Sequence, residues 1–325
     1  MTYTKEQFEK LFNNQLSADE ARNFLIELYK KGESAEDIAI AASVMRKHSI
    51  KLPISKELQA KAIDVVGTGG DKSGSFNIST TVSLLLASLG SVVAKHGNRS
   101  ITSNSGSADV LEALGVNLNL TPKQQLKMLE ETGFCFIFAM NHHPAMKHIM
   151  PIRKSIKHRT IFNILGPLTN PAGAKRYLLG VFDPSYIERM AKALVELNAV
   201  QAFVVSSNDG MDEISLATTT PFAYIEGGIV SQGVIDPEEF GFKLAPKEAI
   251  LGGTAIDNAQ ITRDIFNGKA SDAMRDVVIL NAGFALFVDG KARDIQEAFE
   301  MVRHALESKK ALKHLELIAK VSNSL

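Results

Sequence analysis

The sequence predicts an α/β fold, with a small all-helical domain and a larger α/β domain whose mostly parallel central sheet is flanked by helices. Residues 1–62 contain helix signals only. From Ile63 onward, short apolar runs typical of buried strands alternate with amphipathic segments, as in a parallel sheet with helical crossovers. A polar stretch around residues 144–170 interrupts this alternation, and we expect it to be a helical excursion toward the first domain. The α/β domain then comprises residues 63–143 and 171–325.

The composition is that of an ordinary globular protein. The 325 residues are 45% hydrophobic and 22% charged, and 36 basic residues balance 36 acidic ones. This balance gives no support for broad binding to nucleic acid or to an anionic membrane. The single cysteine, Cys135, lies in an apolar run, which excludes an intramolecular disulfide and predicts a buried, inert thiol. With no signal-peptide pattern and no apolar run of the roughly 18 residues that span a membrane, we expect a cytoplasmic protein.

The first domain is predicted from helix caps. Ser17 and Glu20 have capping-box spacing at the start of one helix, which Gly32 ends, and Ser34 with Asp37 starts the next. So short a helical block has little core of its own and must pack on something else. Its apolar face could serve a subunit interface as well as an intramolecular one.

The α/β domain is predicted from five short apolar runs and the helices between them. The runs that we expect to form strands are residues 63–66, 91–94, 134–140, 177–182 and 202–205. The alternation of Val116, Leu118 and Leu120 predicts a further strand. Helices are expected from near residue 77 and over residues 108–114, 122–132 and 184–197. A Gly227-Gly228 pair predicts a hairpin, and the C-terminal part of the chain is mostly helical in pattern.

A glycine-dense loop at residues 67–75 joins the first strand to a helix. Glycine lets the backbone approach a ligand closely, and a helix N-terminus offers free N–H groups with partial positive charge. We interpret this loop as a phosphate cradle. It matches neither standard fingerprint, because Asp71 occupies the position of a P-loop glycine and Lys72 that of the third dinucleotide glycine. The alternative is a flexible connection without a ligand.

Three more polar loops follow predicted strands, at residues 95–107, 141–153 and 206–215. Ligands of parallel α/β sheets bind at the carboxyl ends of the strands, so we expect all four loops to converge there. Lys95 and Arg99 in the first of these three loops suit a phosphate or pyrophosphate group.

Acidic residues distinguish the loop at residues 206–215. It contains Asp209, Asp212 and Glu213, and carboxylates facing phosphate-binding loops indicate Mg²⁺. For the pair Asp212 and Glu213 taken alone, a solvated turn is the alternative interpretation.

The loop at residues 141–153 is rich in histidine. Neither its histidines nor Cys135 has the spacing of a zinc cage, which disfavours zinc. Arg153 is the better candidate for binding, since a planar guanidinium grips a carboxylate or a phosphate. For His158 and Arg159 we favour a role at the surface or at an interface.

As a set, these motifs resemble those of the anthranilate phosphoribosyltransferases. The resemblance runs in order from about residue 60 to 220, with mild departures at Met140 and at Ser206-Ser207. The matching stretches are residues 67–71, 77–80, 95–100, 105–109, 142–146, Arg153, 159–171 and 209–215.

The resemblance implies an activity and an assembly. The amine of anthranilate attacks C1 of phosphoribosyl pyrophosphate (PRPP) and expels pyrophosphate with the help of Mg²⁺, in the second step from chorismate to tryptophan. It also implies a homodimer formed through the helical domain, and no partner among nucleic acids or membranes.

The resemblance also implies the site residues, by their places in the motifs. Lys95, Asp212 and Glu213 would be catalytic, and Ser79, Asp212 and Glu213 would bind Mg²⁺. The PRPP-binding set would be Gly67, Gly70, Asp71, Ser75, Asn77, Ile78, Ser79, Thr80, Lys95, Gly97, Asn98, Arg99, Ser103 and Ser107. The anthranilate-binding set would be Gly67, His96, Asn98, His143, Arg153 and Pro167, with Arg153 on the carboxylate.

Two rival interpretations share this architecture. A pyrimidine nucleoside phosphorylase also binds ribose and phosphate, but the acidic pair and the Arg153 region count against it. A non-catalytic, nucleic-acid-binding relative would be expected to have a basic surface and to lack Asp212 and Glu213.

Overall fold

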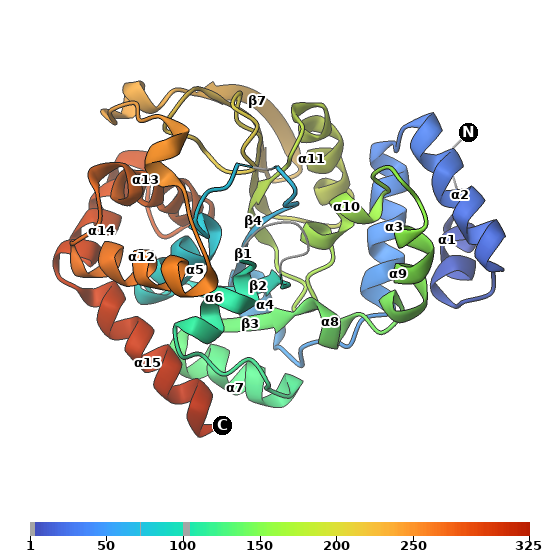
Figure 1. Ribbon diagram of the computed structural model, residues 1–325, viewed down its shortest axis with the longest axis horizontal. Helices are drawn as coiled ribbons and strands as arrows, with labels where there is room; N and C mark the ends of the chain where they lie inside the picture. The colour runs from blue at the N-terminus through green and yellow to red at the C-terminus, as the bar shows by residue number, and fades with distance from the viewer. Residues whose placement is uncertain (1–3, 72, 100–104) are drawn as a thin grey trace.

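The computed structural model describes residues 4–71, 73–99 and 105–325, and its centre is a seven-stranded sheet (Figure 1). The strand order is β3-β2-β1-β4-β5-β6-β7. The first five strands in this order are parallel, and β6 and β7 are antiparallel additions at one edge. The strands are β1 (Ala62–Gly67), β2 (Val92–Gly97), β3 (Phe134–Phe138), β4 (Arg176–Gly180), β5 (Gln201–Val205), β6 (Thr220–Glu226) and β7 (Ile229–Ile235).

A helical region lies to one side of the sheet, where Figure 1 shows the blue N-terminal helices beside two green ones. The capping boxes predicted at Ser17 and Ser34 are both present, and Gly32 follows the first of these helices. The segment around residues 144–170 contacts this region, because His148 Nε2 lies 3.1 Å from the main-chain oxygen of Leu11. The helices of this region are α1 (Lys5–Phe12), α2 (Ala18–Lys31), α3 (Ala35–Lys47), α9 (Met146–Lys154) and α10 (Phe162–Leu165). Helix α4 (Lys56–Lys61) lies beside the sheet, directly before β1.

The sheet separates two apolar clusters. Ile63 and Val65 of β1 face one cluster, whereas Ala62 and Val66 face the other, as the alternation of side chains along a strand requires. The first cluster is covered by α5 (Ile78–Ser88), α6 (Ser107–Ala113), α7 (Pro122–Thr132), α12 (Ala255–Asn267), α13 (Asp272–Val288), α14 (Ile295–Glu307) and α15 (Lys310–Ser324). The second is covered by α11 (Ile187–Glu196) and the helical region. The fold class predicted from the sequence is therefore confirmed.

One predicted strand is wrong. Val116, Leu118 and Leu120 are buried in the first apolar cluster but belong to no strand. The backbone of this segment pairs with a helix end instead of a neighbouring strand, because the amide of Asn117 donates to Ser322 Oγ of α15 (3.0 Å). Alternating burial thus arises from an extended segment packed on α15.

Three strand boundaries also differ from expectation. Strand β4 ends at Gly180, two residues before the expected end. Strand β2 continues to Gly97, so Lys95 and His96 lie in the strand and not in the loop after it. Strand β3 ends at Phe138, and Ala139–His142 forms the short helix α8. In the described part of the chain, every helix is too short or too polar to cross a lipid bilayer.

Candidate active site

The glycine-rich loop turns sharply where β1 ends. Gly69 and Gly70 have φ values of 65° and 75°, a region that only glycine adopts at little cost. The amide of Thr68 donates to the main-chain oxygen of Gly180 at the end of β4 (3.0 Å), and the amide of Phe182 donates to Thr68 Oγ1 (3.0 Å). The loop is therefore fixed to the neighbouring parallel strand.

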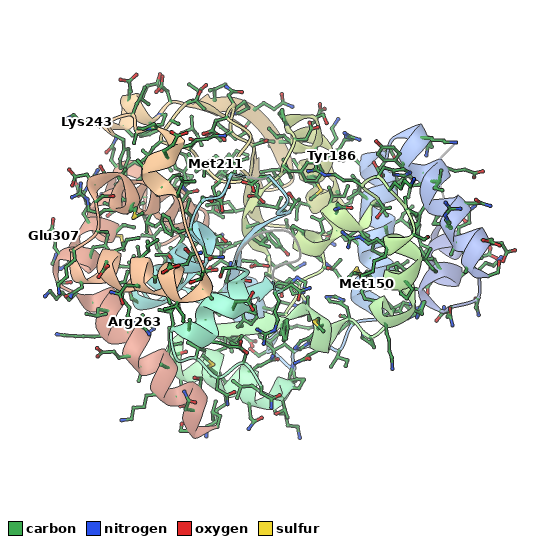
Figure 2. The ribbon with its side chains drawn as sticks, viewed as in Figure 1. Met150, Tyr186, Met211, Lys243, Arg263 and Glu307 are labelled. Atoms are coloured by element: carbon green, nitrogen blue, oxygen red, sulfur yellow. The ribbon has the colours of Figure 1, made fainter. Side chains whose placement is uncertain are left out.

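The acidic loop after β5 crosses the carboxyl ends of β1 and β4, and Figure 2 labels its Met211 in the upper part of the view. The amide of Gly69 donates to Asp212 Oδ2 (2.7 Å). A Cβ atom on Gly67 would overlap the Asp212 carboxylate, and one on Gly180 would overlap the Asp212 main-chain oxygen. Both positions therefore require glycine. The role of Gly180 escaped sequence analysis, although a glycine inside a predicted strand was a usable signal of close backbone approach.

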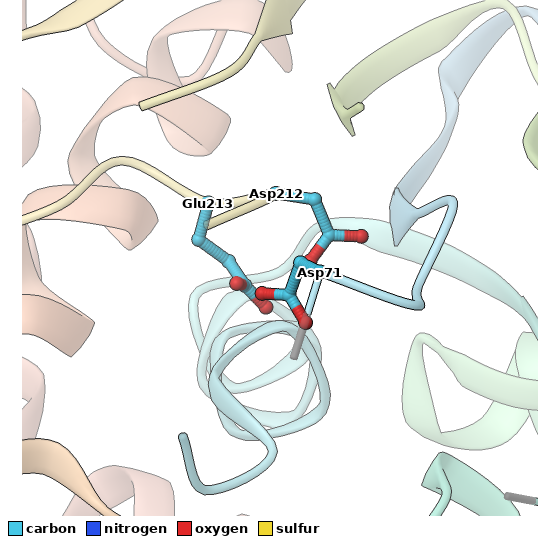
Figure 3. Close-up of side chains that lie close together, drawn as sticks. All are labelled: Asp71, Asp212 and Glu213. Atoms are coloured by element: carbon cyan, nitrogen blue, oxygen red, sulfur yellow. The ribbon is translucent and has the colours of Figure 1, made fainter. Parts of the chain in front are cut away.

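Three carboxylates meet at this crossing, and Figure 3 shows their side chains converging. Asp71, Asp212 and Glu213 each offer an oxygen within 4.8 Å of the others. Burial raises the pKa of Asp212 to about 6, and the charge of Asp71 adds to the shift. Burial, with the charges of Asp212 and Asp71, also raises the pKa of Glu213 well above its usual value. Such crowding of negative charge calls for a cation.

The donor set of the cluster fits Mg²⁺. Mg²⁺ prefers carboxylate oxygen ligands. Asp71 Oδ2 and Glu213 Oε2 are buried and make no hydrogen bond, which leaves both free to coordinate an ion. The sequence assigned Asp71 to PRPP alone, whereas the structure places it in the acidic cluster. Asp209 is directed elsewhere, because it accepts hydrogen bonds from Ser207 and Ser215.

Lys95 lies buried beneath the cluster. Its Nζ atom donates to the main-chain oxygen of Val65 (2.7 Å) and lies 3.4 Å from Ser79 Oγ. Burial lowers the pKa of Lys95 to about 8, although Asp64, Glu213 and Asp212 all act to raise it. Sequence analysis missed Asp64, a buried acid in β1 whose pKa burial raises to about 7.

The start of α5 borders the same space. Asn77 precedes the helix and holds its position through Asn258, whose Nδ2 donates to Asn77 Oδ1 (2.8 Å). Ile78, Ser79 and Thr80 form the first turn, in which backbone N–H groups lack helical partners. Thr80 Oγ1 is buried without a hydrogen bond. Ser75 lies in the preceding loop, with its Oγ 3.1 Å from Ser73 Oγ.

The segment after β2 is built differently from expectation. Arg99 forms ion pairs with Asp109 and Glu112 of α6, both at 2.7 Å. In this structure its guanidinium is therefore paired with carboxylates. Ser107 Oγ donates to the main-chain oxygen of Asn98 (3.2 Å). A Cβ atom on Gly97 would overlap Ser107 Oγ, which explains the glycine.

Ser103, also expected to bind PRPP, lies outside the described residues.

Two histidines form a buried pair beside these loops. The Nε2 atoms of His96 and His143 lie 3.2 Å apart, and His96 Nδ1 lies 3.1 Å from the main-chain oxygen of Gly166. Burial lowers the pKa of His143 to about 4 and that of His96 well below its usual value, so both rings are neutral. Pro167 is buried in the turn that follows Gly166. Among the described residues, His, Cys, Asp and Glu side chains gather as a possible metal site only at Asp71, Asp212 and Glu213.

Two arginines of the excursion differ in their surroundings. Arg153 lies half-buried in the last turn of α9, and burial lowers the pKa of its guanidinium. Arg159 was expected at the surface or at an interface. It is exposed, but it reaches the glycine-rich loop, where its Nη2 donates to the main-chain oxygen of Gly70 (2.8 Å).

Comparisons with known proteins agree with this geometry. A family model described as "Glycosyl transferase family, a/b domain" matches residues 59–312. Anthranilate phosphoribosyltransferases of Rubrobacter xylanophilus and Xanthobacter autotrophicus are both 44% identical to the chain, and each alignment covers 98% of it. The chain belongs to the anthranilate phosphoribosyltransferase family. The alignments cover 92% and 91% of these two relatives, so the likeness extends over nearly their whole length.

Solved structures of this family have the same fold. Anthranilate phosphoribosyltransferase from Thermus thermophilus superposes with a TM-score of 0.92 at 38% identity, covering 99% of this chain and 97% of its own. The enzyme from Saccharomyces cerevisiae in complex with PRPP and Mg superposes with a TM-score of 0.87 at 26% identity, covering 98% and 91%. The resemblance stated from the motifs is thus confirmed.

Proposed function

We propose that the protein transfers the phosphoribosyl group of PRPP to the amine of anthranilate, giving N-(5-phosphoribosyl)anthranilate and pyrophosphate. This is the second step from chorismate in tryptophan biosynthesis. The observation that carries the proposal is 44% identity over 98% of the chain to enzymes of that name. The carboxylate cluster beside a glycine-rich loop is the arrangement that such a reaction requires.

PRPP is assigned to the loops at the carboxyl ends of β1 and β2 and to the start of α5. The proposed contacts include the backbone of the glycine-rich loop and the free N–H groups of the first turn of α5, which suit phosphate oxygens. The full proposed set is Gly67, Gly70, Asp71, Ser75, Asn77, Ile78, Ser79, Thr80, Lys95, Gly97, Asn98, Arg99, Ser103 and Ser107. Arg99 would have to leave its ion pairs with Asp109 and Glu112 to take part.

Anthranilate is assigned to the side of the site that faces the excursion. Arg153 would bind its carboxylate, since its guanidinium is half-buried and has five N–H donors to offer. The neutral rings of His96 and His143 and the buried Pro167 would line the aromatic ring, together with Gly67 and Asn98.

Mg²⁺ is assigned to Asp212, Glu213 and Ser79, with Asp71 beside them. The convergence of three carboxylates supports this assignment. When bound, the ion supplies positive charge for the departing pyrophosphate.

The residues of the chain act mainly by position and charge. An aromatic amine is neutral and nucleophilic at pH 7, so the reaction needs no strong general base. Negative charge grows on the leaving group while the ribose becomes cationic, as in glycoside cleavage. Lys95 and the N–H groups at the start of α5 stabilise that negative charge, and the two binding regions hold the substrates in line.

An anthranilate fluorescence assay tests the proposal. Fluorescence should fall only when the protein, PRPP and Mg²⁺ are all present, and omission of any one should stop the loss. Phosphate-dependent release of base from thymidine, with no loss of anthranilate, would instead support a nucleoside phosphorylase.

We further propose that residues 1–62 and the excursion around residues 144–170 act as one domain, with residues 63–143 and 171–325 as the other. The family resemblance supports a homodimer formed through the helical domain and a cytoplasmic location. Light scattering on the purified protein would test the dimer, for which a mass near twice 35.3 kDa is expected.

A further inference from the structure

Arg159 joins the excursion to the glycine-rich loop. Its Nη2 atom donates a 2.8 Å hydrogen bond to the main-chain oxygen of Gly70, and its Cζ atom lies 3.5 Å from the centroid of the Phe182 ring. A stack against an aromatic face and a charge-assisted hydrogen bond together fix a guanidinium in one orientation. Phe182 is tied to the same loop, since its amide donates to Thr68 Oγ1.

The segment that carries Arg159 is anchored on the helical region. The His158 ring stacks on Tyr29 of α2 with centroids 3.9 Å apart. The Phe162 ring packs against Phe12 of α1 with centroids 5.9 Å apart. Arg159 therefore reaches the loop from a fixed support.

The contact acts at the two-glycine turn of the loop. The positive φ values of Gly69 and Gly70 lie where glycine turns freely, so neighbouring atoms must hold the peptide planes in place. Asp212 holds the amide of Gly69, and Arg159 holds the carbonyl of Gly70. The next residue is Asp71, one of the three clustered carboxylates.

We infer that Arg159 is a positioning residue for the metal and pyrophosphate half of the site. By fixing the Gly70 carbonyl, it keeps the carboxylate of Asp71 beside Asp212 and Glu213. Because the excursion also carries Arg153, the same contact ties the PRPP loop to the segment assigned to anthranilate. This inference rests on the proposed function, which it extends to a residue outside the substrate contacts.

The test is Arg159→Ala, measured in two ways. Steady-state kinetics gives the Mg²⁺ and substrate constants. Calorimetric titration of the protein with PRPP, in the presence of Mg²⁺ and the absence of anthranilate, gives the affinity for PRPP. We expect the half-saturating Mg²⁺ concentration and the KM for PRPP to rise about fivefold, with the KM for anthranilate unchanged. The calorimetric affinity should fall by the same factor. Arg159→Lys, which retains a charge and a donor, should recover part of the loss.

Arg189 provides a matched control. Its Cζ atom lies 4.2 Å from the centroid of the Tyr186 ring, labelled in Figure 2, and its Nη1 donates to the main-chain oxygen of Glu33 (3.0 Å). It thus makes the same kind of bridge to the helical region, one ring removed from Arg159, because Tyr186 packs against Phe182 with centroids 5.4 Å apart. Arg189→Ala should lower the melting temperature and leave the Mg²⁺ and PRPP constants unchanged.

Each result has a separate meaning. If the unmodified protein consumes no anthranilate, the proposed function fails. If it does, and Arg159→Ala has normal Mg²⁺ and PRPP constants, the inference about Arg159 is overturned. A rise confined to the KM for anthranilate would also overturn it, because Arg159 would then be a direct substrate contact.

Discussion

At the scale of single residues, the acidic cluster makes the sharpest prediction. Asp212→Asn or Glu213→Gln should raise the half-saturating Mg²⁺ concentration about tenfold or more, because each removes one charged oxygen ligand. Kinetics as a function of Mg²⁺ would measure this change. Glu226→Gln, a similar change at an exposed hairpin position, is the control and should have no effect.

The same cluster predicts a pH dependence. Asp212 has a pKa raised to about 6, so the carboxylate that Mg²⁺ needs is lost as the pH falls through that value. The half-saturating Mg²⁺ concentration should therefore rise between pH 8 and pH 5.5, measured at fixed PRPP. Phosphate groups also titrate near pH 6. The dependence should become shallower in Asp212→Asn, and an unchanged slope there would assign the effect to the substrate.

Arg153 predicts a change in one kinetic constant. Arg153→Ala should raise the KM for anthranilate about tenfold or more, since a charge-assisted contact to the carboxylate is lost. The KM for PRPP should stay near its normal value. Lys154→Ala removes the exposed neighbouring cation and should leave both constants unchanged. Normal anthranilate kinetics in Arg153→Ala would refute the assignment.

At the scale of elements, the crossing of the acidic loop over β4 makes Gly180 critical. Gly180→Ala would place a Cβ against the Asp212 main-chain oxygen and push the acidic loop away from the glycine-rich loop. We expect loss of Mg²⁺-dependent turnover with an unchanged circular dichroism spectrum. Gly283→Ala creates a comparable clash, with Phe299, inside the helical layer. It should lower the melting temperature without altering the Mg²⁺ dependence.

Local signals in the sequence could predict most elements and the loops of the site. The capping residue Ser17 and the hairpin glycines act within a few residues, and the structure contains the features that they predict. The prediction of a strand at residues 116–120 was wrong because this segment packs on α15, which lies at the far end of the chain and is not visible to local signals. Gly180 and Asp64, and the contact of Arg159 with the glycine-rich loop, were missed for the same reason: each depends on a contact with a distant segment.

At the scale of the whole molecule, the second apolar cluster makes the two predicted domains depend on one another. It runs without interruption from Phe8 of α1 to Ile225 of β6. Arg46 of α3 reinforces it, donating to the main-chain oxygen of Leu168 (2.6 Å) and to the hydroxyl of Tyr177 in β4 (3.2 Å). Separating the helical region from the sheet would therefore expose apolar surface on both sides.

A consequence follows for cooperativity. Regions that share one core unfold together, because the loss of either removes the burial that stabilises the other. We expect differential scanning calorimetry to show a single transition, with the calorimetric enthalpy equal to the van't Hoff enthalpy. A chain starting at Ile63 would lack about a third of the buried residues of the second apolar cluster and should aggregate. The site between the regions then exists only when both regions are folded. A destabilising change in α3 therefore weakens catalysis by depleting the folded population.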